Sequence, residues 1–206
     1  MRTKIQIQLS RLSKSKVSSV GRISSSLLHV RRLVYISMMT SLLIVGAKIT
    51  IGFGPVPFTL QTVCIGIAAY ILGPIWGGVT TIIYLLLGAM GLPVFASGGG
   101  IGKLIGPTGG FIIGFIPMAI IIGVSKKIDS DAIQMLVGIF SIFVLYLFGT
   151  AILVNAVPTK TFGKTLAGLI TTFGLKDVVS IMLAQIIAKK VKNRLGDELI
   201  VDESEQ

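Results

Sequence analysis

One carboxylate stands apart from the other acidic side chains of this sequence. Asp177 lies in or beside a hydrophobic stretch, whereas Asp129, Asp131 and the five acids after Arg194 lie in polar segments. An ionised side chain at the centre of a membrane helix costs about 2.5–3.5 kcal/mol on insertion scales, so an accidental aspartate is disfavoured there. Asp177 is therefore the first candidate for binding a polar ligand. A helix cap, or an ion pair with Lys176, is the structural alternative.

A glycine- and proline-rich segment between two hydrophobic stretches is the second candidate. It covers residues 88–110 and reads GAMGLPVFASGGGIGKLIGPTGG. Irregular backbone cannot face lipid, because each unpaired N–H or C=O costs several kcal/mol there; the segment must therefore reach water or line a cavity. Gly98 and Gly99 permit a ligand to approach the backbone closely, with plain flexibility as the alternative. Lys103 supplies a cation or is a solvated surface lysine, and Thr108 is expected to cap the following helix.

Chemistry that depends on cysteine or histidine clusters is excluded by composition. The chain has one cysteine, Cys64, and one histidine, His29, which lies in a basic segment outside the hydrophobic stretches. A zinc or di-iron site has no ligand set, and a Ser/His/Asp triad has no histidine. The fragment Gly102-Lys103-Leu104 lacks the hydroxyl residue that follows the lysine of a P-loop. We predict no metal, no cofactor, no ATP site and no enzymatic activity.

The composition predicts an all-α integral membrane protein with one membrane domain. Hydrophobic residues make up 52% of the 206 residues and charged residues 13%, against about 25% charged residues in soluble chains. Gly73-Pro74 is expected to form a tight turn between the second and third spans. The six expected spans are residues 33–51, 60–72, 75–90, 110–124, 132–154 and 176–190.

The last span is ambiguous in the sequence. Residues 166–190 form one stretch long enough to cross a bilayer. We favour a break at Gly174, which would leave residues 166–173 as a short interfacial or re-entrant piece. Asp177 would then lie in the first turn of the final helix, where the helix dipole stabilises a carboxylate.

The net charge of +11 reflects membrane topology rather than nucleic-acid binding. Eight of the nineteen Lys and Arg residues lie in residues 1–32, two lie in one short loop and four follow the last span. Positive charge gathers in cytoplasmic segments, so both termini are predicted to be cytoplasmic. Residues 1–32 form a basic arm, although their composition also fits an organellar transit peptide. Residues 33–192 form the membrane domain, and residues 193–206 form an acidic tail.

Three sequence blocks resemble the BioY family, the biotin-binding S components of energy-coupling-factor (ECF) vitamin transporters. The blocks are GPVPFTLQT, GAMGLPVFASGGG and GPTGG, in this order and spacing, and the resemblance covers about residues 31–192. It implies a six-helix membrane protein that captures biotin from outside the cell. It also implies a membrane T component and a pair of ATPases as partners, although some members work without them.

The resemblance also implies roles for individual side chains. Asp177 would accept hydrogen bonds from the ureido N–H groups of biotin, and Lys103 would meet the valerate carboxylate. The family often has Asp-x-x-Lys here, whereas this chain has Ser180 at the lysine position. A hydroxyl can donate to the ureido carbonyl but carries no charge. Lys176 is adjacent to Asp177 but about 100° away around a helix, which makes it an imperfect substitute.

The first outer loop is expected to cover the pocket as it does in the family. It ends at Phe58, Thr59 and Gln61. The polar side chains of Thr59 and Gln61 are expected to hydrogen-bond either the ligand or the backbone of the loop. Phe58 and Phe95 are expected to pack on the thiophane ring, with lipid or core contact as the alternative. Lys48 is expected to snorkel to the membrane surface.

Ser37 and Ser41 form a small-xxx-small pair on the first span, which lets another helix approach closely. S components usually carry Ala-x-x-x-Ala at this place for docking on the T component, so we predict the same role here, with packing inside the chain as the alternative. Three other functions stay open from the sequence alone. They are an S component for a different vitamin, a membrane enzyme, and a membrane scaffold subunit without a ligand.

Overall fold

The computed structural model describes residues 29–51, 58–157 and 161–195. The chain divides into two compact units, Met1–Tyr35 and Ile36–Gln206. The described part of the first unit is the beginning of the helix His29–Lys48.

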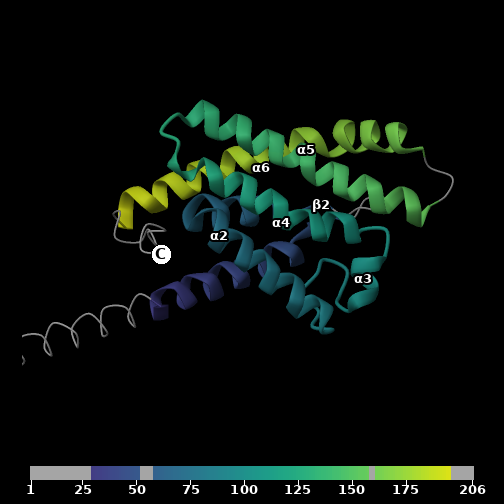
Figure 1. The fold of residues 1–206 in the computed structure, drawn as a ribbon, viewed down its shortest axis with the longest axis horizontal. Helices are drawn as coiled ribbons and strands as arrows, with labels where there is room; N and C mark the ends of the chain where they lie inside the picture. The colour runs from purple at the N-terminus through teal and green to yellow at the C-terminus, as the bar shows by residue number, and fades with distance from the viewer. Residues whose placement is uncertain (1–28, 52–57, 158–160, 196–206) are drawn as a thin grey trace, which may run out of the picture. The chain divides into compact units, whose positions relative to one another are not determined.

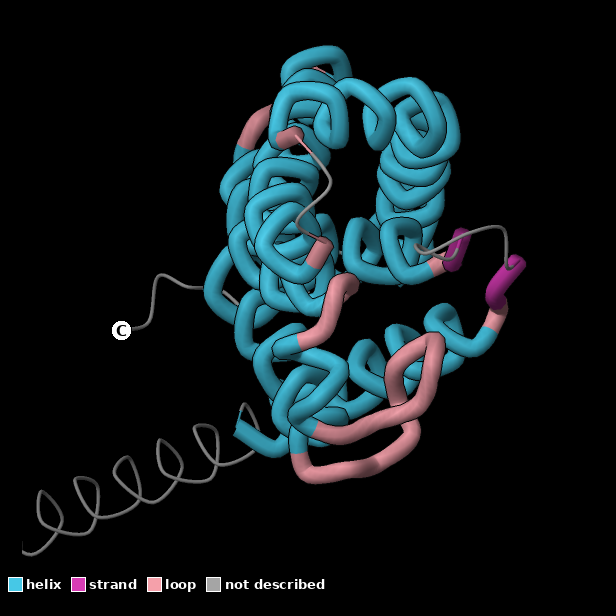
Figure 2. The backbone as a smooth tube through the Cα atoms, turned by 90° about the vertical axis from the view of Figure 1, so that its right-hand side faces the viewer, coloured by secondary structure: helices cyan, strands magenta, loops and turns pink. Residues whose placement is uncertain are grey.

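The second unit is helical apart from one short pair of strands (Figures 1 and 2). Five helices of the described residues are long and apolar enough to cross a membrane, which agrees with the predicted all-α membrane class. The strands pair antiparallel, with Thr50 opposite Thr59. The elements after the first helix are β1 (Thr50–Ile51), β2 (Phe58–Thr59), α2 (Gln61–Ala89), α3 (Ile101–Ile105), α4 (Gly109–Val124), η1 (Ser125–Lys127), α5 (Asp131–Ala156) and α6 (Phe162–Leu195).

Helix α2 is sharply bent where the sequence predicts a turn. Gly73 has φ 85° and ψ −176°, a conformation outside the helix, and Pro74 follows it. A Cβ atom added to Gly77 would lie 3.0 Å from the Cα of Ala69, although eight residues of straight helix span about 12 Å. The chain therefore folds back on itself at Gly73, and α2 consists of two helical segments.

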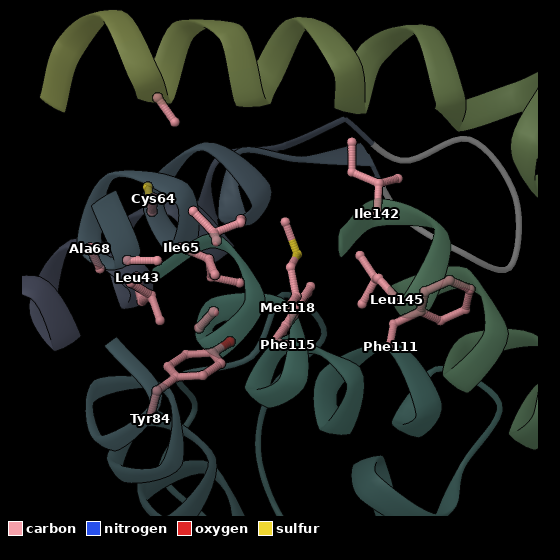
Figure 3. Close-up of a cluster of buried hydrophobic side chains, with 14 of the residues drawn as sticks. Leu43, Cys64, Ile65, Ala68, Tyr84, Phe111, Phe115, Met118, Ile142 and Leu145 are labelled. Carbon is pink, nitrogen blue, oxygen red and sulfur yellow. The ribbon is translucent and has the colours of Figure 1, made fainter. Parts of the chain in front are cut away.

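Helix α4 lies between α2 and α5, and α6 packs against the same two helices (Figure 1). The α4–α5 contact is close because Gly110 faces the backbone of α5, where an added Cβ would lie 2.3 Å from the carbonyl oxygen of Phe148. Apolar side chains fill the space between the helices. Figure 3 shows Phe115 and Met118 of α4 between Ile65 of α2 and Leu145 of α5.

The expected break in the last span is wrong, because α6 runs without interruption through Gly174. Glycine costs a helix interior only about 1 kcal/mol relative to alanine. Gly174 has no proline after it and no positive φ, in contrast to Gly73. Asp177 therefore lies near the middle of a 34-residue helix rather than in a first turn, and the helix dipole does not account for its charge.

The glycine-rich segment 88–110 is an irregular loop carrying the short helix α3. Gly91, Gly98 and Gly100 have positive φ values, which L-residues with side chains rarely adopt. Thr108 occupies the N-cap position of α4, but its side chain makes no capping hydrogen bond, contrary to expectation. Thr108 instead lines the pocket described below.

Candidate functional site

The buried carboxylate of Asp177 is the centre of a polar cluster built from three helices. Its residue is 3% exposed. Thr62 Oγ1 donates to Oδ1 at 2.9 Å, and Tyr146 Oη donates to Oδ2 at 2.6 Å. Lys176 Nζ lies 2.7 Å from Oδ1. Thr62 stands in the first turn of α2, Tyr146 in the middle of α5, and the two charged residues on α6.

This arrangement explains how an ionised aspartate is tolerated in the bundle. Burying a carboxylate costs several kcal/mol unless paired charges and hydrogen bonds replace its hydration. Asp177 receives one cation and two hydroxyl donors, so neither oxygen is left without a partner. The lysine side chain is 27% exposed and the aspartate side chain 4%. The pair therefore reaches from the buried cluster towards water.

A pocket opens directly over this cluster. Including the open solvent at its mouth, the space is about 640 Å³. One part of its wall is polar and contains Asp177, Lys176 and Tyr146. The rest is largely aromatic and apolar. The lining residues are Thr59, Gln61, Thr62, Phe95, Ala96, Ser97, Thr108, Phe111, Ile112, Phe115, Leu145, Tyr146, Phe173, Lys176 and Asp177.

Four of the predicted ligand-binding residues line this pocket: Thr59, Gln61, Phe95 and Asp177. They come from β2, the start of α2, the glycine-rich segment and α6, so segments far apart in sequence meet here. The chain reversal at Gly73 and the packing of α6 against α2 and α5 bring them together.

The other predicted ligand-binding residues lie elsewhere or outside the described side chains. Ser180 is buried, and its hydroxyl donates to the carbonyl oxygen of Lys176 at 2.9 Å, one turn back along α6. Gly98, Gly99 and Lys103 belong to the glycine-rich segment but are not among the described lining residues. The side chain of Phe58 lies outside the described part of the chain, although its backbone forms β2.

Lys176 takes a more direct part in the site than the helical wheel suggests. The expected 100° separation holds for the backbone positions of neighbouring residues. The lysine side chain has a long flexible stem, however, and it brings Nζ to 2.7 Å from the carboxylate of Asp177. The same Nζ lies 3.5 Å from the carbonyl oxygen of Thr59, another residue of the pocket wall.

A second hydrogen-bonded group positions the aromatic wall. Gln61 Nε2 donates to Tyr84 Oη at 2.6 Å, and Tyr84 Oη donates to the carbonyl oxygen of Val94 at 3.3 Å. The Tyr84 ring meets the Phe95 ring edge to face, with centroids 5.4 Å apart. Lys48 does more than snorkel, because its Nζ donates to the carbonyl oxygen of Phe95 at 3.0 Å. Phe95 is thus held at its ring by Tyr84 and at its backbone by Lys48.

Sequence reasoning missed Thr62 and Tyr146, the two hydroxyl donors to Asp177. Thr62 belongs to the motif GPVPFTLQT, so its place beside Gln61 was a usable signal. Tyr146 lies in an apolar span without any local motif, and only the packing of α5 against α6 identifies it. Among the described residues, no group of three or more His, Cys, Asp or Glu side chains is placed to hold a metal ion.

Comparison with known proteins identifies the family. The sequence model of the BioY family matches residues 15–197. The biotin transporter BioY of Thermotoga maritima is 38% identical over 165 residues, which cover 79% of this chain and 96% of the relative. A probable biotin transporter BioY of Pyrococcus horikoshii is 35% identical over 76% of this chain and 93% of its own.

A solved structure supports the same assignment. It is the crystal structure of the S-component for biotin from an ECF-type ABC transporter, which superposes with a TM-score of 0.74 at 27% identity. The match covers 84% of this chain and 97% of that chain. The fold, the sequence and the three motif blocks therefore agree, and this chain belongs to the BioY family.

Proposed function

We propose that this chain captures biotin as the substrate-binding S component of an ECF-type vitamin transporter. The observation that carries the proposal is the pocket over Asp177, where a buried carboxylate adjoins an aromatic wall. Biotin requires both features, because its ureido ring is polar and its thiophane ring is apolar. The family is one of transporters, so the protein moves its ligand across the membrane and does not transform it.

The hydrogen-bond capacity of Asp177 limits how it holds the ureido ring. An ionised carboxylate has about four acceptor positions. Thr62 and Lys176 approach Oδ1, and Tyr146 approaches Oδ2. One position on Oδ2 is left for a ureido N–H group. We assign the second N–H to the side-chain oxygen of Gln61, which accepts only from Thr59 among the described residues.

Lys176 is the proposed donor to the ureido carbonyl. Its ammonium has three N–H donors and already contacts Asp177 and the backbone of Thr59, both in the pocket wall. In this proposal Ser180 supports the site through the α6 backbone, since its hydroxyl is directed to the carbonyl oxygen of Lys176. The cation that the family places three residues after the aspartate would here come from the residue before it.

The thiophane ring and the valerate carboxylate of biotin would contact the part of the pocket wall away from Asp177. The thiophane ring would pack against Phe95 and Phe173, which bound the apolar part of the pocket. The valerate carboxylate would lie near the hydroxyls of Ser97 and Thr108, at the start of α4. We expect Lys103, partly buried on α3, to act at longer range.

We propose six crossings, with α2 supplying two of them on either side of Gly73. The two lysines of η1, the lysine-rich end of α6 and both termini would face the cytoplasm. Ser37 and Ser41 are both exposed, and Ser41 Oγ bonds the carbonyl oxygen of Ser37. This small surface suits a T component, which would act with a pair of ATPases.

Calorimetry on the purified protein in detergent tests the substrate. Biotin is titrated first, then thiamine and lipoate under identical conditions. We expect tight binding of biotin and at least a hundredfold weaker binding of the other two. Binding of thiamine or lipoate without biotin would assign a different vitamin. No binding of any of the three would contradict the proposal and favour a scaffold role.

A further inference from the structure

A second polar cavity lies at the other end of the bundle from the Asp177 pocket. Its wall includes Lys126 from η1, Asp129 from the loop after it, Asp131 from the start of α5, and Lys189 and Lys192 from α6. The space is about 770 Å³ including its open mouth. On α6, Lys189 follows Asp177 by twelve residues, or about 18 Å along the helix axis. The two cavities are therefore separate.

One ion pair forms part of the structure of this cavity. Lys189 Nζ lies 2.5 Å from Asp131 Oδ2. Gln185 Nε2 donates to the backbone carbonyl oxygen of Asp131 at 2.9 Å and approaches Gln134 Oε1 at 3.4 Å. These contacts tie α6 to the first turn of α5 and neutralise one charge of each sign.

Opposite charges also line the remainder of the cavity. Among the described residues, the side chains of Asp129 and Lys192 make no hydrogen bond or ion pair. Lys126 adds a second ammonium to the wall. The cavity thus presents a carboxylate and ammonium groups to the same small space. The three lysines and two aspartates of the wall give it a net charge of +1, which attracts a phosphate group. Asp129 offers the ammonium of a zwitterion a partner that a group with only a negative charge would leave unused.

The neighbouring surface shows which kind of molecule reaches this cavity. Leu136 on α5 is 64% exposed, and Met182 and Ile186 on α6 are 45% and 48% exposed. All three lie within one helical turn of Gln134 or Gln185, which line the cavity. Large apolar side chains that are exposed on membrane helices contact acyl chains. The cavity therefore lies where the apolar surface ends and the charged rim begins, which is the level of lipid headgroups.

We propose that this cavity binds a phosphoethanolamine group, with the phosphate on Lys192 and Lys126 and the ammonium near Asp129. Basic pockets between membrane helices bind phosphate-bearing headgroups, and the carboxylate adds a partner for the primary ammonium. The adjoining apolar surface favours phosphatidylethanolamine as the source. Soluble O-phosphoethanolamine carries the same chemistry without acyl chains. This inference does not depend on the identity of the transported ligand.

The test measures binding of three probes to the delipidated full-length protein in detergent. The probes are dihexanoyl-phosphatidylethanolamine, dihexanoyl-phosphatidylglycerol and O-phosphoethanolamine. We expect the ethanolamine lipid to bind at least fivefold tighter than the glycerol lipid. O-phosphoethanolamine should bind more weakly than the lipid; equal affinity would support the headgroup site and assign a soluble source.

Two variants and one matched control assign the binding to the cavity. Lys192→Gln should weaken both lipids at least fivefold, because the phosphate loses its cation. Asp129→Asn should abolish the preference for ethanolamine over glycerol. Lys190→Gln removes an exposed lysine of the same helix that does not line the cavity, and it should change nothing.

Three results would overturn the inference. They are no binding of any probe, equal binding of the two lipids to the unmodified protein, and an equal loss in Lys190→Gln and Lys192→Gln. Biotin affinity is measured on every variant. It should stay unchanged, which shows that the variants are folded and separates this site from the Asp177 pocket.

Discussion

Two lysine–aspartate pairs of similar geometry have very different environments, one within α6 and one between α6 and α5. Lys176 and Asp177 are 2.7 Å apart, and the aspartate side chain is 4% exposed. Lys189 and Asp131 are 2.5 Å apart, with side chains 58% and 59% exposed. An exposed pair contributes about 0–1 kcal/mol because water and salt screen it. Breaking a buried pair is far more costly, since one charge is left without compensation.

Burial and surroundings, rather than contact distance, distinguish the role of the Lys176–Asp177 pair from that of the Lys189–Asp131 pair. Asp177 has two hydroxyl donors besides its lysine and faces an aromatic pocket. Asp131 joins α5 to α6 at the rim.

Removing the two lysines should give very different results. Lys176→Met leaves Asp177 buried without its cation, and a buried pair broken in this way costs about 3–5 kcal/mol. Partial exposure of Lys176 places the expected loss at the lower end. We expect a clearly lower melting temperature and at least tenfold weaker biotin binding by calorimetry. Lys189→Met should change neither the melting temperature nor the biotin affinity beyond experimental error. Equal effects of the two variants would contradict the comparison.

Tyr146→Phe tests the hydroxyl that holds the second carboxylate oxygen. Its loss removes a hydrogen bond to a charged group, worth about 1.5–3 kcal/mol, so biotin affinity should fall about ten- to hundredfold. Tyr70→Phe is the matched control, because Tyr70 is equally buried but its hydroxyl donates to the carbonyl oxygen of Gln134, outside the pocket. If both variants bind biotin normally, Tyr146 has no part in the site.

Gly88→Ala tests the aromatic wall. An added Cβ would lie 2.0 Å from the ring of Phe95, which must then move. Overpacking of this kind costs about 1–3 kcal/mol, and we expect a fivefold or greater loss of biotin affinity. Gly168→Ala is the control, since a Cβ at that helical position meets nothing within 4 Å. Gly168→Ala should leave the stability of the protein unchanged or slightly higher. Unchanged affinity in Gly88→Ala would show that Phe95 does not contact biotin.

Lys48→Met should have the smallest effect of the series. It removes the hydrogen bond to the carbonyl oxygen of Phe95, which is worth about 0.5–1.5 kcal/mol. We expect biotin affinity to fall two- to tenfold, mainly through faster dissociation, as measured by surface plasmon resonance. A loss as large as that of Lys176→Met would mean that Lys48 contacts the ligand itself.

The fold was predictable where local chemistry and pattern agree. Gly73 is followed by proline between two apolar segments, and the chain turns there as expected. Gly174 offers only the low helix propensity of glycine, and the packing of α6 on α2 and α5 overrides it. The predicted break at Gly174 is therefore wrong, and this glycine is part of a continuous helix.

The sequence predicts a site residue whose type is rare in membrane helices, such as Asp177. It does not predict a site residue whose type is common there, such as Tyr146. Asp177 is conspicuous because an acid inside an apolar span is costly. Tyr146 is one hydroxyl in a long apolar helix, and its distance from Asp177 depends on the packing of α5 against α6. A helical wheel shows the direction of each residue but not how far its side chain extends. It therefore does not predict that the Nζ atom of Lys176 contacts the carboxylate of Asp177.

The central claim is that the buried carboxylate of Asp177 binds the transported vitamin. The most direct measurement is calorimetric biotin binding by Asp177→Asn, with Asp131→Asn as the matched exposed variant. Asp177→Asn should bind biotin at least tenfold more weakly, while Asp131→Asn should match the unmodified protein. Undiminished biotin affinity in a folded Asp177→Asn protein would contradict the claim.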